Sequence, residues 1–377
     1  MAERLKQLIL LLRAHLMDAS IGAEFPLLTL EEWNELYSLA ISHGVAGFAY
    51  EGAYRSGIEI PSSLKDAWQR KMIHDVQHYY SIKRECLRVL SILQENNIKP
   101  VILKGFSASH TYPYPELRVM SDMDILVPER FYEAALAIES FGYLARKEVA
   151  VHHVEFSKEN YLLELHRIPF TPIGSKNYDQ LIEAVAFTGE KCEYLNINGF
   201  DVPVLCEEDF IHESFEHVLK HLIHDRMALR NICDILMLFV SRNGKNWQKH
   251  YDLLVTCDMD DLFSGIVSFL VYEFGLPLEA VEGIDLLSRD QAEEFGANVF
   301  SVANVYKGTN HYYSTLTLSG AFLMLRHYLK ALSRDLLIKY PYCRKSKLLR
   351  PFALIHAYGD YGIELIKKLA GWRRGGG

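Results

Sequence analysis

The hydrophobic pattern of this chain changes twice along its length. Up to about residue 96, apolar residues recur at helical spacing, and the same spacing returns from about residue 207. Between residues 97 and 206 the apolar runs are short and are separated by turn residues, including Asn198-Gly199, the strongest short hairpin signal. The sequence therefore predicts an α+β fold, in which a small mixed β-sheet core is flanked by N-terminal and C-terminal helical regions.

Three domains are expected along the chain: an N-terminal helical region (1–96), an α/β core (97–206) and a C-terminal helical domain (207–377). A chain of 377 residues is longer than one compact core usually absorbs, which favours several lobes. A long helix is expected from Pro61 to about Gln94, because its apolar residues form one stripe. The strand-like runs of the core are 99–103, 124–127, 143–149, 152–157, 161–166, 192–197 and 200–205.

Composition and charge restrict the environment and the partners. Hydrophobic residues make up 49% of the chain and charged residues 23%, as in soluble globular proteins. The net charge of −8 gives no basic footprint, which argues against a nucleic acid as the main partner. The six cysteines form no CxxC pair, and no stretch approaches the roughly 20 apolar residues of a membrane span. We therefore expect a cytoplasmic protein with reduced thiols and no membrane partner.

Two aspartates, Asp122 and Asp124, lie at the start of one of the short strands. Residues two apart in a strand point to the same side, so these carboxylates are expected to project together. Neighbouring carboxylates repel, and a hard divalent cation such as Mg²⁺ or Mn²⁺ is their natural counter-charge. The alternative is an exposed strand start with two solvated aspartates, because this short pattern is frequent by chance.

The two aspartates are preceded by the end of another predicted strand, which leads into Gly105 and Ser107. Gly105 allows backbone N–H groups to approach a phosphate, and the helix that follows offers unpaired donors. Lys104 can add a positive charge and Ser107 a hydroxyl contact. The alternative is a plain strand-to-helix turn.

A third carboxylate, Glu164, lies on the later run Tyr161–His166, where alternation places it on the same face as His166. Two acids on one strand and a third on a neighbouring strand suit two-metal phosphoryl or nucleotidyl transfer. The first two hold metal ions, and the third binds metal or accepts the proton of the attacking hydroxyl.

Several of these strings together resemble a known family. Val101–Gly105 (VILKG), Tyr112-Pro113, Arg118–Val127 (RVMSDMDILV), Gly142-Tyr143 and Glu164–His166 (ELH) follow in order. This pattern is similar to that of the uncharacterised nucleotidyltransferase family in the polymerase-β-like superfamily, over about residues 30 to 240. In the wider superfamily the loop is Gly-Ser or Gly-Gly and comes shortly before the aspartate pair. Here Phe106 separates Gly105 from Ser107, and seventeen positions separate Gly105 from Asp122.

The resemblance implies a fold with a nucleotidyltransferase-like core and a Mg²⁺-dependent (or Mn²⁺-dependent) activity. It implies catalytic and metal-binding roles for Asp122, Asp124 and Glu164. It implies nucleotide contacts from five residues of the loop and the central motif: Lys104, Gly105, Ser107, Arg118 and Ser121.

The expected reaction is transfer of a nucleoside monophosphate from a nucleoside triphosphate to a hydroxyl or phosphate acceptor by a two-metal mechanism. The acidic balance favours a small molecule, a sugar, a peptide or a protein as acceptor. Two alternatives remain open at this point. One is a phosphotransferase that uses the same pocket, and the other is a catalytically degenerate nucleotide-binding or regulatory module.

The histidines suggest two further possibilities. His217, His221 and His224 recur at i, i+4 and i+7, so they share one helix face. We favour packing of this face, or lining of a substrate pocket, over a zinc site, because interior histidines are common; a zinc hydrolase is the most distant alternative. His152 and His153 are expected to point to opposite sides of a strand, so that at most one of them joins a site.

Overall fold

The computed structural model describes most of the chain. The described residues are 3–146, 152–169, 192–197, 199–224, 227–242, 247–256, 259–300, 335–344 and 346–360. The chain divides into two compact units, each built from three separate segments. The first unit contains Met1–Lys83, Lys104–Met120 and Glu207–Ser314, and the second contains Arg84–Leu103, Ser121–Cys206 and Thr315–Gly377. The division into 1–96, 97–206 and 207–377 stays a prediction.

The first unit begins with helices that pack closely. Helix α1 packs against α2 and α3, and Leu8, Leu11 and Leu12 of α1 are fully buried. Gly52 of α3 is required at this contact, because a Cβ atom there would lie 1.9 Å from the carbonyl oxygen of Leu11. The bounds are Glu3–Leu16 for α1, Leu30–Ser42 for α2, Ala46–Arg55 for α3 and Ser62–Glu95 for the long helix α4, whose first part belongs to this unit.

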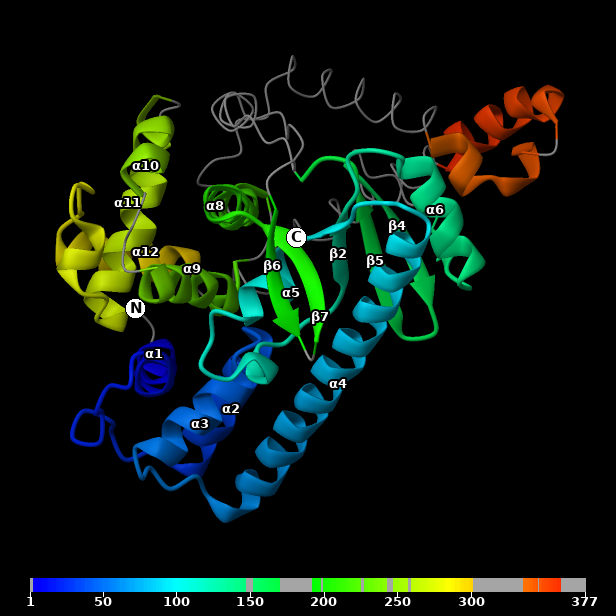
Figure 1. Cartoon of the computed structure of the whole chain (residues 1–377). Coiled ribbons are helices and arrows are strands. Elements are labelled where there is room, and N and C mark those ends of the chain that lie inside the picture. Colours follow the sequence, from blue (N-terminus) through cyan, green and yellow to red (C-terminus); the bar gives the residue numbers. More distant parts are fainter. Residues whose placement is uncertain are drawn as a thin grey trace. The chain divides into compact units, whose positions relative to one another are not determined.

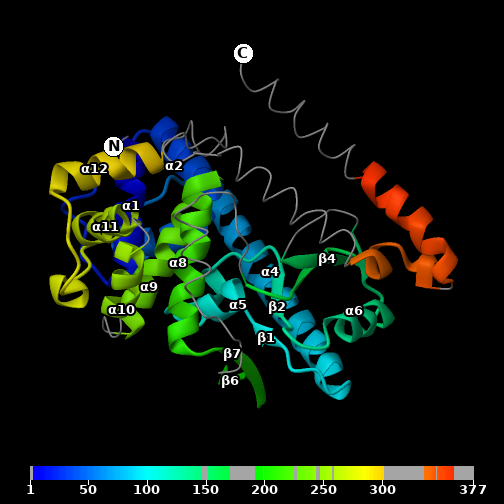
Figure 2. The ribbon, with the colours of Figure 1, turned by 90° about the horizontal axis from the view of Figure 1, so that it is seen from above.

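The remaining helices of the first unit come from its other two segments. The short helix α5 contacts α8 and α9, while α11 packs against α10 and α12 (Figures 1 and 2). The bounds are Lys104–Ser109 (α5), Pro115–Leu117 (η1), Glu207–His224 (α8), Leu229–Arg242 (α9), Trp247–Thr256 (α10), Asp260–Phe269 (α11), Leu270–Phe274 (η2), Leu278–Val281 (η3) and Arg289–Val299 (α12).

The second unit contains a seven-stranded mixed sheet in the order β3-β4-β5-β2-β1-β7-β6. Strand β2 pairs parallel with β5 and antiparallel with β1, and β1 pairs parallel with β7. Two antiparallel hairpins, β4–β5 and β6–β7, complete most of the sheet. The bounds are Val101–Ile102 (β1), Met123–Leu126 (β2), Leu144–Ala145 (β3), His153–Lys158 (β4), Tyr161–His166 (β5), Cys192–Ile197 (β6) and Phe200–Leu205 (β7). The mixed sheet and the helices confirm the α+β fold class.

The two faces of the β2, β5 and β4 strands differ in character. Glu155 of β4 and Asp124 of β2 are both paired with Glu164 of β5, so these three carboxylates lie on one face. The opposite face is apolar, and each of its six central side chains is at most 3% exposed: Met123, Ile125, Val154, Phe156, Leu163 and Leu165.

The apolar face is covered by the last part of α4. Lys158 extends from this face, and its Nζ donates to Oε1 of the buried Glu85 of α4 at 3.1 Å. The hydroxyl of Tyr143 donates to the same oxygen at 3.2 Å. Because Glu85 is almost inaccessible to solvent, these donors satisfy a charge that would otherwise be costly to bury. The titratable groups of these three strands that could take part in chemistry, Asp124, Glu155 and Glu164, therefore lie on the polar face of the sheet.

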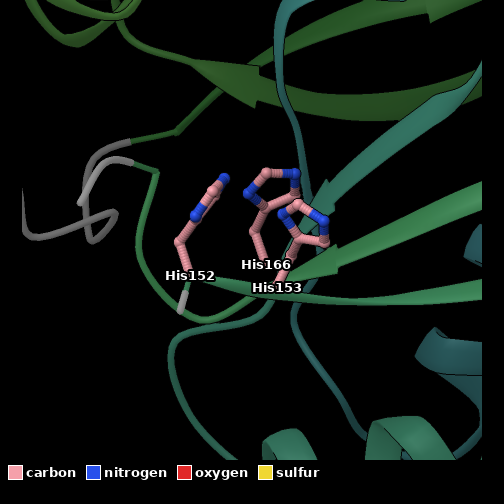
Figure 3. Close-up of side chains that lie close together, drawn as sticks. All are labelled: His152, His153 and His166. Atoms are coloured by element: carbon pink, nitrogen blue, oxygen red, sulfur yellow. The ribbon is translucent and has the colours of Figure 1, made fainter. Parts of the chain in front are cut away.

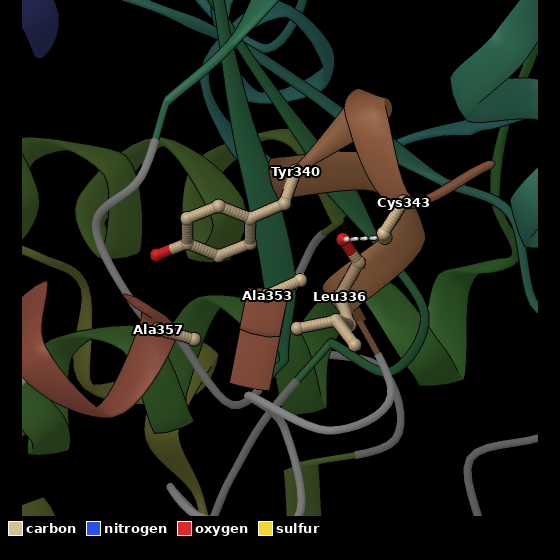
Figure 4. Close-up of a cluster of buried hydrophobic side chains, with 5 residues drawn as sticks. All are labelled: Leu336, Tyr340, Cys343, Ala353 and Ala357. Atoms are coloured by element: carbon tan, nitrogen blue, oxygen red, sulfur yellow. Dashed lines mark hydrogen bonds between the residues drawn. The ribbon is translucent and has the colours of Figure 1, made fainter. Parts of the chain in front are cut away.

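The C-terminal described segments form a small cluster of their own. Leu336, Tyr340, Cys343, Ala353 and Ala357 are buried together (Figure 4). The guanidinium of Arg344 donates to both carboxylate oxygens of Glu139 at 2.6 and 2.7 Å, which ties this segment to α6. The bounds are Phe131–Ser140 for α6, Pro341–Arg344 for η4, Lys347–Leu349 for η5 and 350–360 for the last helical stretch.

Most predicted elements of the core are present with small shifts. The long helix expected from Pro61 to Gln94 is confirmed as α4, and Gly199 turns between β6 and β7 with a positive φ of 83°. The strand expected at 143–149 is shorter, with β3 at Leu144–Ala145, while 147–151 and Asn198 lie outside the described residues. In the ranges described above, no helix has the length and apolar character of a bilayer crossing.

Candidate functional site

The parallel pairing of β2 with β5 builds the centre of the site. Asp124 is the register partner of Glu164, and Leu126 is the partner of His166. On the other side of β5, Glu164 is paired with Glu155 and His166 with His153. Side chains of paired residues stand side by side on the same face. Three strands therefore place three carboxylates in one row and two imidazoles in the next.

Asp124 is almost fully buried, with 6% of its surface exposed. Its Oδ1 lies 3.0 Å from Nε2 of His166, a side chain that has no solvent exposure. The same nitrogen lies 3.2 Å from Oε2 of Glu164. A single ring nitrogen is thus located between two carboxylates, which holds both of them in place.

Asp122 lies one residue before β2 and is partly exposed. The hydroxyl of Ser121 donates to its Oδ1 at 3.2 Å. The close group that includes Asp124 consists of Asp124, Glu164 and His166, whose ligand atoms lie within 4.8 Å of one another. The sequence-based metal role of Asp122, and the contact of Ser121 with a nucleotide, stay predictions.

Histidines add nitrogen donors to this carboxylate face. His152, His153 and His166 have ligand atoms within 4.8 Å of one another (Figure 3). The expectation that His152 and His153 point to opposite sides of a strand is wrong. The strand β4 begins at His153, so His152 lies before it and does not follow the alternation of the strand.

His153 contacts the acidic row through both of its nitrogens. Nδ1 lies 3.6 Å from Oε2 of Glu164, and Nε2 lies 3.6 Å from Oε1 of Glu155. Burial lowers the pKa of His153, while the Glu155 and Glu164 carboxylates oppose part of that shift. The imidazole is therefore neutral near pH 7, the form in which histidine binds metal ions.

Cys86 of α4 is a buried thiol of the same unit. Burial raises the pKa of Cys86 to about 12, and the negative charge of Asp124 acts in the same direction. A thiol with such a pKa stays protonated at neutral pH, and a protonated thiol is a poor nucleophile and a poor metal ligand. Cys86 therefore contributes to packing.

The predicted phosphate-loop residues belong to the first unit. Lys104 and Arg118 line one pocket there, together with Glu213, His217 and Asp234. The guanidinium of Arg118 forms a fork on Asp234, from Nε to Oδ1 at 2.7 Å and from Nη2 to Oδ2 at 2.6 Å. Both side chains are largely buried, at 7% and 13% exposed. This pocket is the place in the first unit where two of the predicted nucleotide contacts meet.

Two further details concern the loop itself. A Cβ atom on Gly105 would lie 3.3 Å from Nη1 of Arg118, so a side chain at this position crowds the guanidinium. Lys104 has a positive φ of 32°, and Ser107 is 7% exposed. The nucleotide-binding roles of Lys104, Gly105, Ser107 and Arg118 stay predictions.

Two histidines of α8, His217 and His221, lie close together in the part of the chain that the structure describes. Nε2 of His217 and Nε2 of His221 lie 3.1 Å apart, and the side chain of His224 lies outside the described part. His217 lines the pocket with Arg118 and Asp234, and its role as a substrate-lining residue stays a prediction.

Sequence reasoning missed a different group in the first unit: His212, Glu216 and His250 have ligand atoms within 4.8 Å of one another and are all buried. Only the spacing of His212 and Glu216, four residues apart on α8, could have drawn attention to it.

A larger pocket in the second unit holds none of the predicted site residues. It has a volume of about 570 Å³ and lies beside the C-terminal end of β2. Val101, Pro128 and Tyr194 are among the residues that line it. Its position separates it from the carboxylate row of β2 and β5.

Comparison with known proteins agrees with the motifs. A search of curated proteins found no match. The model of a family described as uncharacterised nucleotidyltransferase matches residues 29–269, which is more than half of the chain. The matched span contains the whole of β2 and β5 and the predicted phosphate loop. The resemblance stated from the sequence is thereby confirmed, and the chain belongs to the uncharacterised nucleotidyltransferase family.

Proposed function

We propose that this chain transfers a nucleoside monophosphate from a nucleoside triphosphate to a hydroxyl or phosphate acceptor. The observation that carries the proposal is the register of β2 and β5, which pairs Asp124 with Glu164 on the polar face of the sheet. Membership of a nucleotidyltransferase family supports the class of reaction. The kind of acceptor and the two-metal mechanism are part of what we propose, in addition to the class of reaction.

Asp122, Asp124 and Glu164 are the residues that we assign to divalent ions, either Mg²⁺ or Mn²⁺. The donor set fits such ions, because carboxylate oxygens of Asp124 and Glu164 lie within 4.8 Å of each other and hard cations prefer oxygen ligands. Paired carboxylates repel, so a cation also offsets a charge conflict that burial makes worse. When bound, such ions neutralise phosphate charge and polarise the attacking oxygen.

Glu164 is the proposed proton acceptor for the attacking hydroxyl. Its exposure is greater than that of Asp124, at 16% against 4% of the side chain, so an acceptor reaches it more easily. The imidazole of His166, at 3.2 Å from Oε2, holds the carboxylate in one orientation. General-base catalysis requires such a fixed carboxylate within hydrogen-bond distance of the acceptor.

The phosphate-binding roles are proposed on the contacts of each unit separately. In the first unit, Lys104 and Arg118 place two positive charges in one pocket beside the glycine of the loop. A guanidinium carries five N–H donors, so Arg118 can hold Asp234 and also contact phosphate, and a glycine allows close approach to the backbone. Ser107 is assigned to the same loop. In the second unit, Ser121 is assigned through its hydrogen bond with Asp122.

The net charge of −8 favours a small molecule, a sugar, a peptide or a protein as the acceptor. We place the reaction in the cytoplasm. A nucleic acid acceptor would need a basic surface to offset its phosphates. We therefore expect the labelled product to be insensitive to nucleases.

The test is incubation of the purified chain with Mg²⁺, cell extract and ATP labelled at either the α or the γ phosphate. Nucleotidyl transfer moves the α label to the acceptor and releases pyrophosphate, whereas a phosphotransferase moves only the γ label. Asp124→Asn should abolish transfer, while Asp18→Asn, with a side chain that is 92% exposed, serves as the matched control. Triphosphate binding without transfer of either label would favour the degenerate regulatory module.

A further inference from the structure

Three imidazoles gather beside the carboxylate row of the second unit (Figure 3). The ring centroids are 4.4 Å apart for His152 and His153, 5.0 Å for His153 and His166, and 5.4 Å for His152 and His166. Their ligand atoms lie within 4.8 Å of one another. This grouping brings together nitrogen donors, whereas the two-metal chemistry proposed above uses carboxylate oxygens.

The backbone of the sheet fixes the three positions. His153 and His166 are register partners on β4 and β5. His152 lies one residue before β4, and its carbonyl oxygen accepts a hydrogen bond from the N–H of Arg167 at 2.9 Å. The carbonyl oxygen of His166 in turn accepts from the N–H of Val127 at 2.8 Å. Ligands on hydrogen-bonded strands are positioned more accurately than ligands on loops.

The hydrogen bonding of His153 is incomplete. The side chain is 9% exposed, and neither ring nitrogen has a partner at hydrogen-bond distance, since the nearest carboxylate oxygens are 3.6 Å away. Buried polar atoms are nearly always paired at hydrogen-bond distance, so two contacts of 3.6 Å leave the His153 ring, at the centre of a donor cluster, able to take a closer ligand. A coordinated metal ion would take one of these nitrogens.

We propose that His152, His153 and His166 form a nitrogen-ligand site for a transition-metal ion of the Zn²⁺ class. Imidazole nitrogen binds Zn²⁺ at about 2.0–2.1 Å, and Mg²⁺ prefers oxygen, so this site selects a different ion from the carboxylate pair. Glu155 supplies the fourth ligand, because its carboxylate belongs to a second close group with His153 and Glu164.

The contact between His166 and Asp124 has a specific role in this site. Metal-binding histidines commonly hold a carboxylate with their second ring nitrogen, which fixes the orientation of the ring. Nε2 of His166 lies 3.0 Å from Oδ1 of Asp124, so Asp124 is the positioning residue for this ligand. The ion would in turn fix the orientation of the ring, and with it the position of the nitrogen that contacts Asp124.

The experiment is a titration of the full chain, first freed of metal, with Co²⁺, whose visible absorption reports tetrahedral nitrogen coordination. We expect one Co²⁺ per chain, displaced by Zn²⁺ and retained in excess Mg²⁺. Loss of a ligand in His152→Ala or His153→Ala should weaken Co²⁺ binding by more than the roughly 10- to 100-fold that loss of a positioning partner causes. His152→Ala is the safer variant for folding, because His152 is only partly buried.

His74→Ala is the matched control, since His74 and His78 are four residues apart on α4 and stack at 6.3 Å. Its titration should match that of the wild-type chain. Stoichiometric Co²⁺ binding that both site variants leave unchanged would overturn the proposal, as would an absence of binding by the wild-type chain. The proposal does not depend on nucleotidyl transfer. Loss of transfer with intact Co²⁺ binding contradicts the proposed function alone, and Mg²⁺-dependent triphosphate binding without Co²⁺ binding contradicts the nitrogen site alone.

Discussion

Both carboxylate oxygens of Asp234 accept hydrogen bonds from the guanidinium of Arg118, although 116 positions separate the two residues in the sequence. The hydroxyl of Tyr112 donates to the same carboxylate at 2.6 Å. The ion pair is largely buried and lines the pocket of Lys104. An arginine predicted to bind phosphate is thus already oriented by a protein carboxylate.

Arg118→Lys should weaken triphosphate binding about ten- to hundred-fold, since a charge-assisted contact contributes about 1.5–3 kcal/mol and an ammonium cannot hold Asp234 as a fork while also contacting phosphate. Asp234→Asn breaks the same ion pair but retains the guanidinium. Calorimetric titration with Mg²⁺-ATP and urea unfolding should be measured for both variants. If Arg118 serves only as the partner of Asp234, both variants lose stability and neither loses affinity.

Gly105→Val should lower triphosphate affinity in the same assay. A Cβ atom at this position lies 3.3 Å from Nη1 of Arg118, and the fork on Asp234 restricts how far the guanidinium can move away. Gly105→Ala should have a smaller effect in the same direction. Gly22→Ala is the control, because its nearest atom would be 3.8 Å away. Equal affinities for Gly105→Val and the wild-type chain would remove this loop from the phosphate site.

Asp122→Asn and Asp124→Asn should retain the fold and lose Mn²⁺ affinity together with turnover, because the amide is nearly isosteric but carries no charge. Asp124→Asn also removes the charged partner of His166, so its loss of thermal stability should exceed that of Asp122→Asn. Calorimetric titration with Mn²⁺ and a thermal melt measure both effects. Full turnover in Asp122→Asn would contradict the two-metal assignment.

Glu164→Gln should depress turnover strongly and leave Mg²⁺-triphosphate binding measurable, since Asp122 and Asp124 still hold one ion in the proposed arrangement. Glu159→Gln is the matched control, because Glu159 is exposed in the turn between β4 and β5. Turnover and nucleotide affinity should be measured on the same preparations. If both stay at the wild-type level, Glu155, which is paired with Glu164, becomes the better candidate for the third carboxylate.

Acidification should destabilise the first unit through buried histidines. Burial lowers the pKa of His15 to about 4, with the positive charge of Arg55 acting in the same direction, whereas an exposed histidine has a pKa near 6.5. The unfolded chain therefore binds more protons between pH 6.5 and 4, and the free energy of unfolding falls as the pH decreases through this window. The effect is on the order of 3 kcal/mol for one such group.

His15→Phe tests this pH dependence, because His15 stacks between Phe48 and Tyr114 and an aromatic ring replaces it without a charge. Urea unfolding at pH 7 and pH 4.5 should give a smaller stability difference for His15→Phe than for the wild-type chain. An unchanged difference would mean that other groups account for the acid sensitivity. His43, whose pKa burial also lowers to about 4, is the next residue to replace.

The sequence was sufficient for local features of the fold. The alternation along Tyr161–His166 predicts that Glu164 and His166 share a face, and their 3.2 Å contact confirms it. Thr29, followed by Glu32 three residues later, is typical of a helix N-cap, and its side chain accepts from the N–H of Glu32 in a capping box. Such features depend on residues that are only a few positions apart, so their periodicity and hydrogen-bonding groups are visible in the sequence.

The sequence was insufficient for pairings between distant residues. The parallel register of Asp124 with Glu164 and the fork between Arg118 and Asp234 join residues far apart in the chain, and alternation specifies a face but not a partner strand. The exact end of a strand is also difficult to predict from the sequence. His152 was expected to be part of the strand, but β4 begins at His153, so the alternation of the strand does not give the direction of the His152 side chain. Hydrophobic patterns locate strands to within a few residues only.

The central position of β2 in the sheet has a consequence for motion. Hydrogen-bonded neighbours flank β2 on both sides, with β5 on one side and β1 on the other, whereas β3 and β6 form the edges. The backbone amides of β2 should therefore be among the slowest to exchange with deuterium, and those of β3 among the fastest. Asp124 is thus attached to backbone that opens only when the sheet itself unfolds, so that fluctuations of the edges leave the carboxylate in place.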